Sequence, residues 1–159
     1  MMRFISETPD CFERSHAAGH ITASAWLLNP AGDKALLTLH SKLGLWLQPG
    51  GHADGDTDPL RVALREAEEE SGISGIRPLC TDIYDVDIHT IPAHPASGAT
   101  EHLHYDVRYL LQAPHEHFCL SHESKALAWV APTELPALRP PTDESVLRLA
   151  RLYPHPQKN

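Results

Sequence analysis

Apolar and polar residues alternate along several stretches of the chain, which predicts strands at 20–29, 34–40, 44–47, 76–91, 102–111 and 126–130. The first of these carries apolar residues on both alternations, as expected for a strand buried on both faces for part of its length. Two other stretches, 58–72 and 143–152, place small or apolar residues at helical spacing. A length of 159 residues suffices for one domain with a sizeable core.

The stretch 58–72 has the start and stop signals of a helix. Asp58 before Pro59 predicts an N-cap followed by the first helical residue, and Gly72 is placed for a left-handed C-terminal cap. The expected packing stripe consists of small and apolar side chains at helical spacing: Leu60, Ala63, Leu64, Ala67 and Ser71. A helix that packs on one side is therefore predicted here.

The same helix gathers negative charge on another face. Glu66, Glu68, Glu69 and Glu70 crowd its C-terminal half, where the helix dipole disfavours anions. Glu66 and Glu70, a like-charged pair one turn apart, lower the stability of the helix by a further ~0.2–0.5 kcal/mol. A solvated acidic face is one interpretation; a site for hard divalent cations is the other, and the preceding glycine loop favours the second.

The glycine loop and helix together carry a family resemblance. Gly51, followed at fixed spacing by Arg65-Glu66-Ala67-Glu68-Glu69-Glu70-Ser71-Gly72-Ile73, resembles the box of the Nudix hydrolases. The approach Leu45-Trp46-Leu47-Gln48-Pro49-Gly50 is similar to the usual entry into that box. Two positions depart: Ala67 is smaller than the usual aliphatic residue, and Thr57 replaces the first Glu. The resemblance implies a single Nudix-type domain over residues 1–159, an α/β/α sandwich with a mixed central sheet.

By this resemblance, the protein is expected to be a metal-dependent hydrolase that cleaves a diphosphate linkage in a nucleoside diphosphate derivative. The cofactor would be Mg²⁺, or Mn²⁺ in its place. Glu69 and Glu70 would be the principal metal ligands, with the Gly50 carbonyl. Glu66 would bind metal or accept the proton of the attacking water, and Arg65 would orient the carboxylates.

Acidic residues outside the helix bear on the same site. The resemblance suggests that Glu123, in the loop before Trp129, brings an extra ligand; an exposed loop acid is the alternative. The missing Glu at Thr57 usually supports the metal cluster. Asp54 or Asp56, in the same loop, could compensate for it.

Polar side chains alternate with apolar ones in two of the predicted strands. Strand geometry puts each polar set on one face, which is either an ordinary solvent face or a wall that contacts substrate. On the second interpretation His104 and Asp106 are candidate substrate-binding residues. The polar sets are Asp85, Asp87 and His89 in one strand, and His102, His104, Asp106 and Arg108 in the other.

The chain contains 12 histidines, which raises the question of a zinc site. His102 and His104 are two residues apart and share a strand face, and His89 or His94 could join them. No cysteine accompanies them and the sequence shows no compact ligand set, so a structural zinc is the less favoured interpretation.

Composition limits the partners. The formal net charge is −8, which gives no general attraction to nucleic acid or to an anionic membrane, so a polyanionic substrate would need metal ions or a local basic patch. The resemblance implies that the substrate is a small nucleotide-like molecule. Three widely spaced cysteines, no signal-peptide pattern at 1–12 and no membrane-spanning apolar run predict a cytoplasmic protein. The resemblance is compatible with a homodimer.

Two other functions share the expected fold. A binding or regulatory module that recognises a nucleotide without hydrolysing it is favoured by Thr57 and opposed by the retained Glu66, Glu69 and Glu70. An isopentenyl diphosphate isomerase would need a catalytic cysteine, and neither Cys80 nor Cys119 has a recognisable setting for one.

Overall fold

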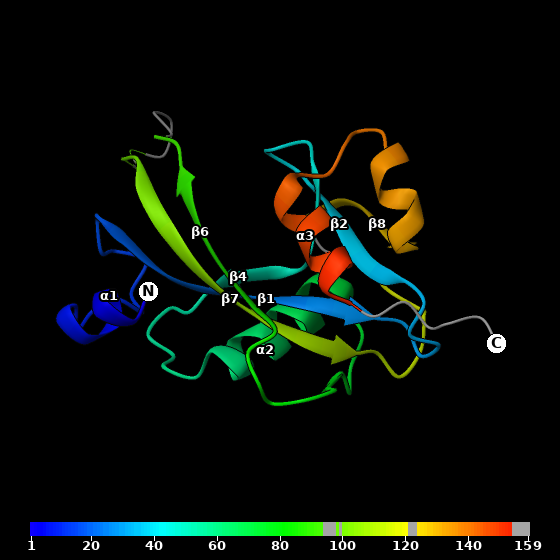
Figure 1. Ribbon diagram of the computed structural model, residues 1–159, viewed down its shortest axis with the longest axis horizontal. Helices are drawn as coiled ribbons and strands as arrows, with labels where there is room; N and C mark the ends of the chain where they lie inside the picture. The colour runs from blue at the N-terminus through cyan, green and yellow to red at the C-terminus, as the bar shows by residue number, and fades with distance from the viewer. Residues whose placement is uncertain (94–97, 99, 121–123, 154–159) are drawn as a thin grey trace.

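The computed structural model describes residues 1–93, 98, 100–120 and 124–153, and forms a mixed α/β fold around an eight-stranded sheet (Figure 1). The strands are β1 (Gly19–Leu28), β2 (Ala35–His40), β3 (Trp46–Leu47), β4 (Gly50–His52), β5 (Arg77–Pro78), β6 (Asp85–Ile91), β7 (His102–Gln112) and β8 (Ser124–Val130). The helices are α1 (Met2–Glu7), α2 (Pro59–Ser71), η1 (Pro132–Ala137) and α3 (Glu144–Leu152). The mixed α/β prediction is confirmed.

The sheet is organised around β1 and β7. These strands run parallel over their whole lengths, in a register that pairs His20 with His104 and Ser24 with Arg108. All other pairings are antiparallel: β6 and β5 on β7, β2 and β4 on β1, and β3 and β8 on β2. Every residue of β1 is buried, whereas the sequence predicted burial on both faces for only part of the strand.

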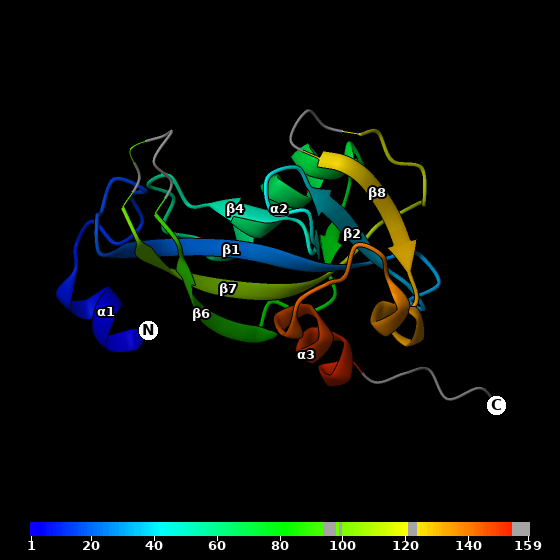
Figure 2. The same ribbon diagram turned by 90° about the horizontal axis from the view of Figure 1, so that it is seen from above.

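Helices cover the two sides of the sheet (Figure 2), where α2 and α3 lie on opposite sides of β1 and β7. Alternate residues of β1 divide between two cores. Ile21, Ala23, Ala25 and Leu27 pack with α2. Trp26 and Leu28 pack with β2, η1 and α3. On the α3 side of β1, the side chains that come before Trp26 are polar. This face of the sheet is therefore apolar at one end and polar at the other.

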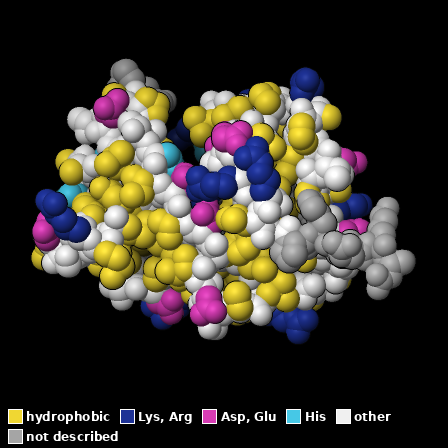
Figure 3. Space-filling model, viewed as in Figure 1, with side chains coloured by type: hydrophobic (Ala, Val, Ile, Leu, Met, Phe, Trp, Pro, Cys, Tyr) yellow, Lys and Arg dark blue, Asp and Glu magenta, His cyan; other side chains and the backbone are white. Residues whose placement is uncertain are grey.

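One local expectation needs correction, and one open alternative is decided. The strand predicted over 76–91 is divided into β5 and β6: residues 79–84 between them are not in a strand, although the Leu79 N–H still donates to the Leu110 carbonyl at 3.0 Å. The polar set of β6 does not face solvent: Val86 and Ile88 are 41% and 49% exposed, whereas Asp85, Asp87 and His89 are half-buried. The apolar set instead contributes to an apolar surface beside α1, seen in Figure 3.

Among the described residues, no helix combines the length and the apolar character needed to cross a lipid bilayer.

Candidate functional site

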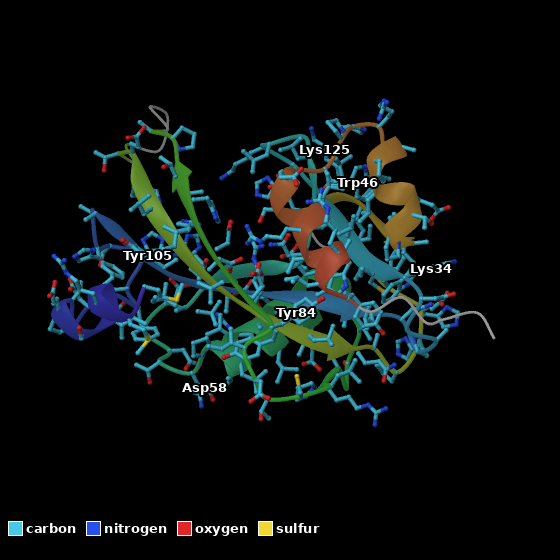
Figure 4. The ribbon with its side chains drawn as sticks, in the orientation of Figure 1. Lys34, Trp46, Asp58, Tyr84, Tyr105 and Lys125 are labelled. Atoms are coloured by element: carbon cyan, nitrogen blue, oxygen red, sulfur yellow. The ribbon has the colours of Figure 1, made fainter. Side chains whose placement is uncertain are left out.

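The helix of the box has the caps that the sequence predicted. The Asp58 carboxylate, at the start of α2 in Figure 4, accepts hydrogen bonds from the backbone N–H groups of Leu60 and Arg61 at 3.1 and 3.3 Å. Gly72 has a φ of 67° and its N–H closes the last turn. Ala63, Ala67 and Ser71 of the predicted stripe are buried, together with Val62. This packing fixes which face of α2 carries the glutamates.

Two of the glutamates lie against the glycine strand β4. The Gly50 N–H donates to Glu70 Oε1 at 2.8 Å. A Cβ atom at Gly51 would overlap the Glu66 carboxylate, so this carboxylate fits only because position 51 is glycine. Antiparallel pairing with β1, Ala23 opposite Gly51, holds β4 in place. The fold therefore gathers two carboxylates of α2 along a two-glycine segment of backbone.

The other charged residues of the box point in different directions. The Arg65 guanidinium lies 3.0 Å from the Glu66 carboxylate and donates to the His52 carbonyl at 2.8 Å, which ties α2 to β4. Glu69 is exposed. Glu68 accepts a hydrogen bond from the Gly75 N–H at 2.8 Å beyond the end of the helix. Arg65 thus contacts a candidate ligand, whereas Glu68 belongs to the helix terminus.

The loop acids that were expected to compensate for Thr57 pair with arginines instead. Arg14 binds Asp54 with two hydrogen bonds of 2.6 and 2.9 Å. Arg61 binds Asp56 at 2.6 Å and lowers the pKa of this carboxyl to about 2. Both acids are neutralised by these contacts, so the structure gives no support to their replacing the missing Glu; Thr57 is exposed.

A polar face of the sheet adjoins the box on the α3 side. We use this name for the side chains of His20, Thr22 and Ser24 on β1, His102, His104, Asp106 and Arg108 on β7, and Asp85, Asp87 and His89 on β6. The Asp106 carboxylate, 4% exposed, accepts hydrogen bonds from Thr22, Ser24 and Arg108 at 3.1, 2.7 and 2.8 Å. Ser24 is also opposite Gly50 across the β1–β4 ladder. Asp106 therefore reaches the edge of the box through one serine.

Arginines neutralise the remaining acids of the polar face. Buried Arg108 contacts Asp85 and Asp87 at 3.2 and 3.1 Å. Arg148 of α3 reaches the same two carboxylates at 2.7 and 2.9 Å. Burial alone would raise the pKa of Asp87, but the Arg148 hydrogen bond and both arginine charges lower it overall. This network attaches α3 to the sheet, beside Tyr84, whose hydroxyl donates to the Leu149 carbonyl at 3.0 Å (Figure 4).

Histidines occupy the other end of the polar face. His104 lies among the rings of His20, His52, His89 and His102, with ring centroids 4.8–5.5 Å from its own. Burial lowers the pKa of His104 to about 2 and that of His52 to about 4, helped by neighbouring positive charges. These rings are neutral at pH 7. Figure 3 shows histidine beside the hollow between the two halves of the molecule.

Sequence reasoning placed some of these residues and missed others. It singled out His104 and Asp106, which the fold puts on the polar face. It missed His20, although alternation with Thr22 and Ser24 places all three on one face. It also missed Arg148, for which the sequence offered no signal beyond the helical pattern around it. The predicted ligand Glu123 and the histidine His94 lie outside the described residues.

The donor atoms of the box fit a hard divalent cation. Glu66, Glu69 and Glu70 offer carboxylate oxygens within two turns of one helix, and oxygen is the donor that Mg²⁺ and Mn²⁺ prefer. The glycines at 50 and 51 allow the backbone to approach closely. The residues present therefore suit the cofactor that the sequence predicted.

Comparison with known proteins identifies the family. The NUDIX domain model matches residues 19–150. A Lactococcus lactis subsp. cremoris (strain MG1363) protein named "Probable DHNTP pyrophosphohydrolase" is 32% identical over 80 residues, which cover 50% of this chain and 47% of that protein. The chain therefore aligns with about half the length of this relative.

Solved structures share the fold. A NUDIX-family hydrolase from Clostridium perfringens has a TM-score of 0.65 at 23% identity, covering 82% of this chain and 93% of that one. The dihydroneopterin triphosphate pyrophosphohydrolase of E. coli has a TM-score of 0.63 at 16% identity, covering 84% and 93%. Because the family model spans well over half of the sequence, this chain belongs to the Nudix family.

Proposed function

We propose that this protein is a pyrophosphohydrolase that uses Mg²⁺ or Mn²⁺ to cleave a diphosphate linkage in a nucleoside diphosphate derivative. The observation that carries the proposal is the approach of Glu66 and Glu70 to the Gly50–Gly51 backbone. With Mg²⁺ bound, this oxygen site supplies charge neutralisation for the diphosphate and an acidified water.

The protein groups have separate roles in this proposal. Glu69 and Glu70, with the Gly50 carbonyl, hold the metal. Glu66 binds metal or accepts the proton that leaves the attacking water, and its contact with Arg65 at 3.0 Å keeps the carboxylate oriented. The base that accepts this proton must lie within hydrogen-bond range of the water. The Glu66 carboxylate, held against β4, meets this requirement when the water binds beside it.

Substrate contacts are proposed on the polar face. His104 and Asp106 lie on β7, and Asp106 is connected to the box through Ser24. The hydrogen bonds that Asp106 accepts make it a positioning residue for Ser24 and Arg108, whereas the ring of His104 is neutral at pH 7. The named relative suggests dihydroneopterin triphosphate as one compound to test among the candidates.

The test is release of phosphate or pyrophosphate from a panel of nucleoside triphosphates, dinucleotides, nucleotide sugars and dihydroneopterin triphosphate, with Mg²⁺ and with chelator. We expect Mg²⁺-dependent release that Glu70→Gln and Glu69→Gln each reduce by at least about 100-fold. Glu68→Gln is the matched control, because Glu68 contacts Gly75 and has no proposed role.

Three results would contradict the proposal. Release that persists in chelator, or that is equally reduced in Glu68→Gln and Glu70→Gln, would mean that the box glutamates do not act through metal. Tight nucleotide binding with no release from any compound would favour the alternative, a binding or regulatory module, for which Thr57 is the motivating departure.

A further inference from the structure

Three imidazoles from the two central strands converge at the end of the polar face. His20 on β1 is directly opposite His104 on β7, and His102 precedes His104 by two residues on the same face. One ring nitrogen from each of the three lies within 4.8 Å of those of the other two. The group therefore joins residues more than 80 positions apart in the sequence at a single point of the sheet.

The hydrogen bonds of these rings are incomplete within the described part of the chain. His20 is 3% exposed, yet neither of its ring nitrogens has a partner, and Nε2 of His104 also has none. Buried polar atoms without partners are costly and rare, so each needs a physical explanation. A ligand shared by the three rings would bind one nitrogen of each ring, which includes one nitrogen of His20 and one of His104.

The tautomer of His102 suits a metal ligand. Its Nδ1 lies 2.7 Å from the Thr100 carbonyl, an acceptor, so Nδ1 carries the proton and donates it. The lone pair is then on Nε2. A ligating histidine that donates its other N–H to a backbone carbonyl is the usual arrangement in metal sites.

The charge state of the rings also suits a cation. Burial lowers the pKa of His104 to about 2, and burial together with the neighbouring His102 lowers the pKa of His20. Both rings are therefore neutral at pH 7, the form in which imidazole binds metal.

The two neighbouring histidines are less suitable. Nδ1 of His52 accepts a hydrogen bond from Arg14 at 3.1 Å, which leaves the proton on its Nε2 and no lone pair for a ligand. Nδ1 of His89 lies 3.1 Å from Asp87, so its Nε2 can accept, but it is not among the nitrogens that gather within 4.8 Å. Among the described residues, the ligand set is thus a group of three.

We propose that His20, His102 and His104 form a binding site for one divalent transition-metal ion of the Zn²⁺ class, separate from the glutamates of α2. Imidazole donors select Zn²⁺, Co²⁺, Ni²⁺ and Cu²⁺ over Mg²⁺. Three protein ligands leave a further coordination position for water or a substrate atom. Small ring rotations close the site, since nitrogens around a tetrahedral ion are roughly 3.4 Å apart.

This site is distinct in position from the box. His20 and Ser24 are four residues apart on β1, a separation of about 13 Å along a strand, and Ser24 is the residue opposite Gly50. An ion held by the three rings is therefore not shared with Glu70, which contacts Gly50.

The test is a titration of the metal-free full-length protein with Co²⁺, read by visible absorption, followed by displacement with Zn²⁺. Tetrahedral Co²⁺ with nitrogen ligands absorbs far more strongly than octahedral Co²⁺ among oxygens, so the spectrum distinguishes this site from the box. We expect one equivalent of the strongly absorbing species, with affinity at least about tenfold weaker in His102→Gln and in His104→Gln.

Matched variants separate the two sites. Glu70→Gln and His52→Gln should retain the strong Co²⁺ spectrum, because neither residue belongs to the three-ring set. Absence of the spectrum in the wild type, retention of full affinity in His102→Gln, or loss of the spectrum in Glu70→Gln would each overturn the proposal. If circular dichroism shows that His104→Gln is unfolded, two measurements still test the proposal. They are the Co²⁺ affinity of His102→Gln, which changes a partly exposed residue, and the Co²⁺ stoichiometry of the wild type.

Discussion

The box and the polar face use charge in opposite ways. On the polar face, the carboxylates of Asp85, Asp87 and Asp106 meet Arg108 at 2.8–3.2 Å, and Arg148 adds a second cation to the first two. In the box, several negatively charged carboxylates lie along one helix and approach the glycines of β4. Removing one partner of a buried ion pair leaves an uncompensated charge and destabilises the fold, whereas gathered like charges are typical of a ligand site. We therefore expect mutations of the arginines in the first region to change stability and mutations of the box glutamates to change activity.

The largest effect is expected from Arg108→Leu. This change leaves Asp106 and two half-buried carboxylates without their central cation, which should lower the free energy of unfolding by about 3–5 kcal/mol. Urea unfolding followed by circular dichroism measures it. Arg151→Gln, which removes an exposed pair with Glu144, is the control and should cost less than about 1 kcal/mol. Equal losses of unfolding free energy in the two variants would contradict a structural role for the polar face.

Gly51→Ala should separate activity from stability in the box. Gly51 is not among the glycines with a positive φ, so the backbone accepts alanine, but the new Cβ displaces the Glu66 carboxylate. Hydrolysis should fall by roughly 10–100-fold while the free energy of unfolding changes by less than about 1 kcal/mol. Steady-state rates and urea unfolding are measured on the same preparation.

A double-mutant cycle sharpens this expectation. If Gly51→Ala acts through Glu66, it should have little further effect in a Glu66→Gln background, because the displaced carboxylate is already absent. Additive losses of activity would instead mean that the alanine disturbs some other part of the site.

Arg148→Gln tests the charge pairing through its pH dependence. The pKa of Asp87 is lowered from its ordinary value of 3.8 in the fold, so the stabilisation from its pairing is present above that value and lost as the pH falls through the folded pKa. Since Arg148 is 40% exposed, the variant should be less stable by about 0.5–1 kcal/mol at pH 7. In thermal unfolding, the stability difference between the wild type and Arg148→Gln should disappear at strongly acidic pH. A difference that stays constant with pH would mean that Arg148 stabilises the fold through packing.

The smallest effect is expected at position 57. Thr57→Glu restores the acid that the box lacks and should raise hydrolysis at limiting Mg²⁺, since the loop acids Asp54 and Asp56 are held by arginines. Thr57→Gln, of equal length but uncharged, should not. The measurement is the hydrolysis rate of both variants during a Mg²⁺ titration. Equal gains in rate would mean that loop geometry, and not the added charge, is responsible.

Local patterns predicted much of the fold. Caps at Asp58 and Gly72 bounded α2 because capping depends on residues within one turn. Alternation located the long strands, but it could not say which face of β6 is covered. The apolar residues Val86 and Ile88 are exposed because α3 and its Arg148 lie over the acids on the other face. Alternation did not show the break between β5 and β6, and the α1 helix had no recognised signal.

The sequence alone determined the box, because its glutamates, arginine and glycines lie within one loop and one helix, where spacing fixes relative position. Only the tertiary structure decided the polar face. His20 and His104 are 84 residues apart, and they meet because β1 and β7 pair in parallel with one particular register. Parallel pairing joins strands through a long connection, so neither strand's own pattern specifies its partner or register. That pairing brings together the histidines and joins Asp106 to Ser24.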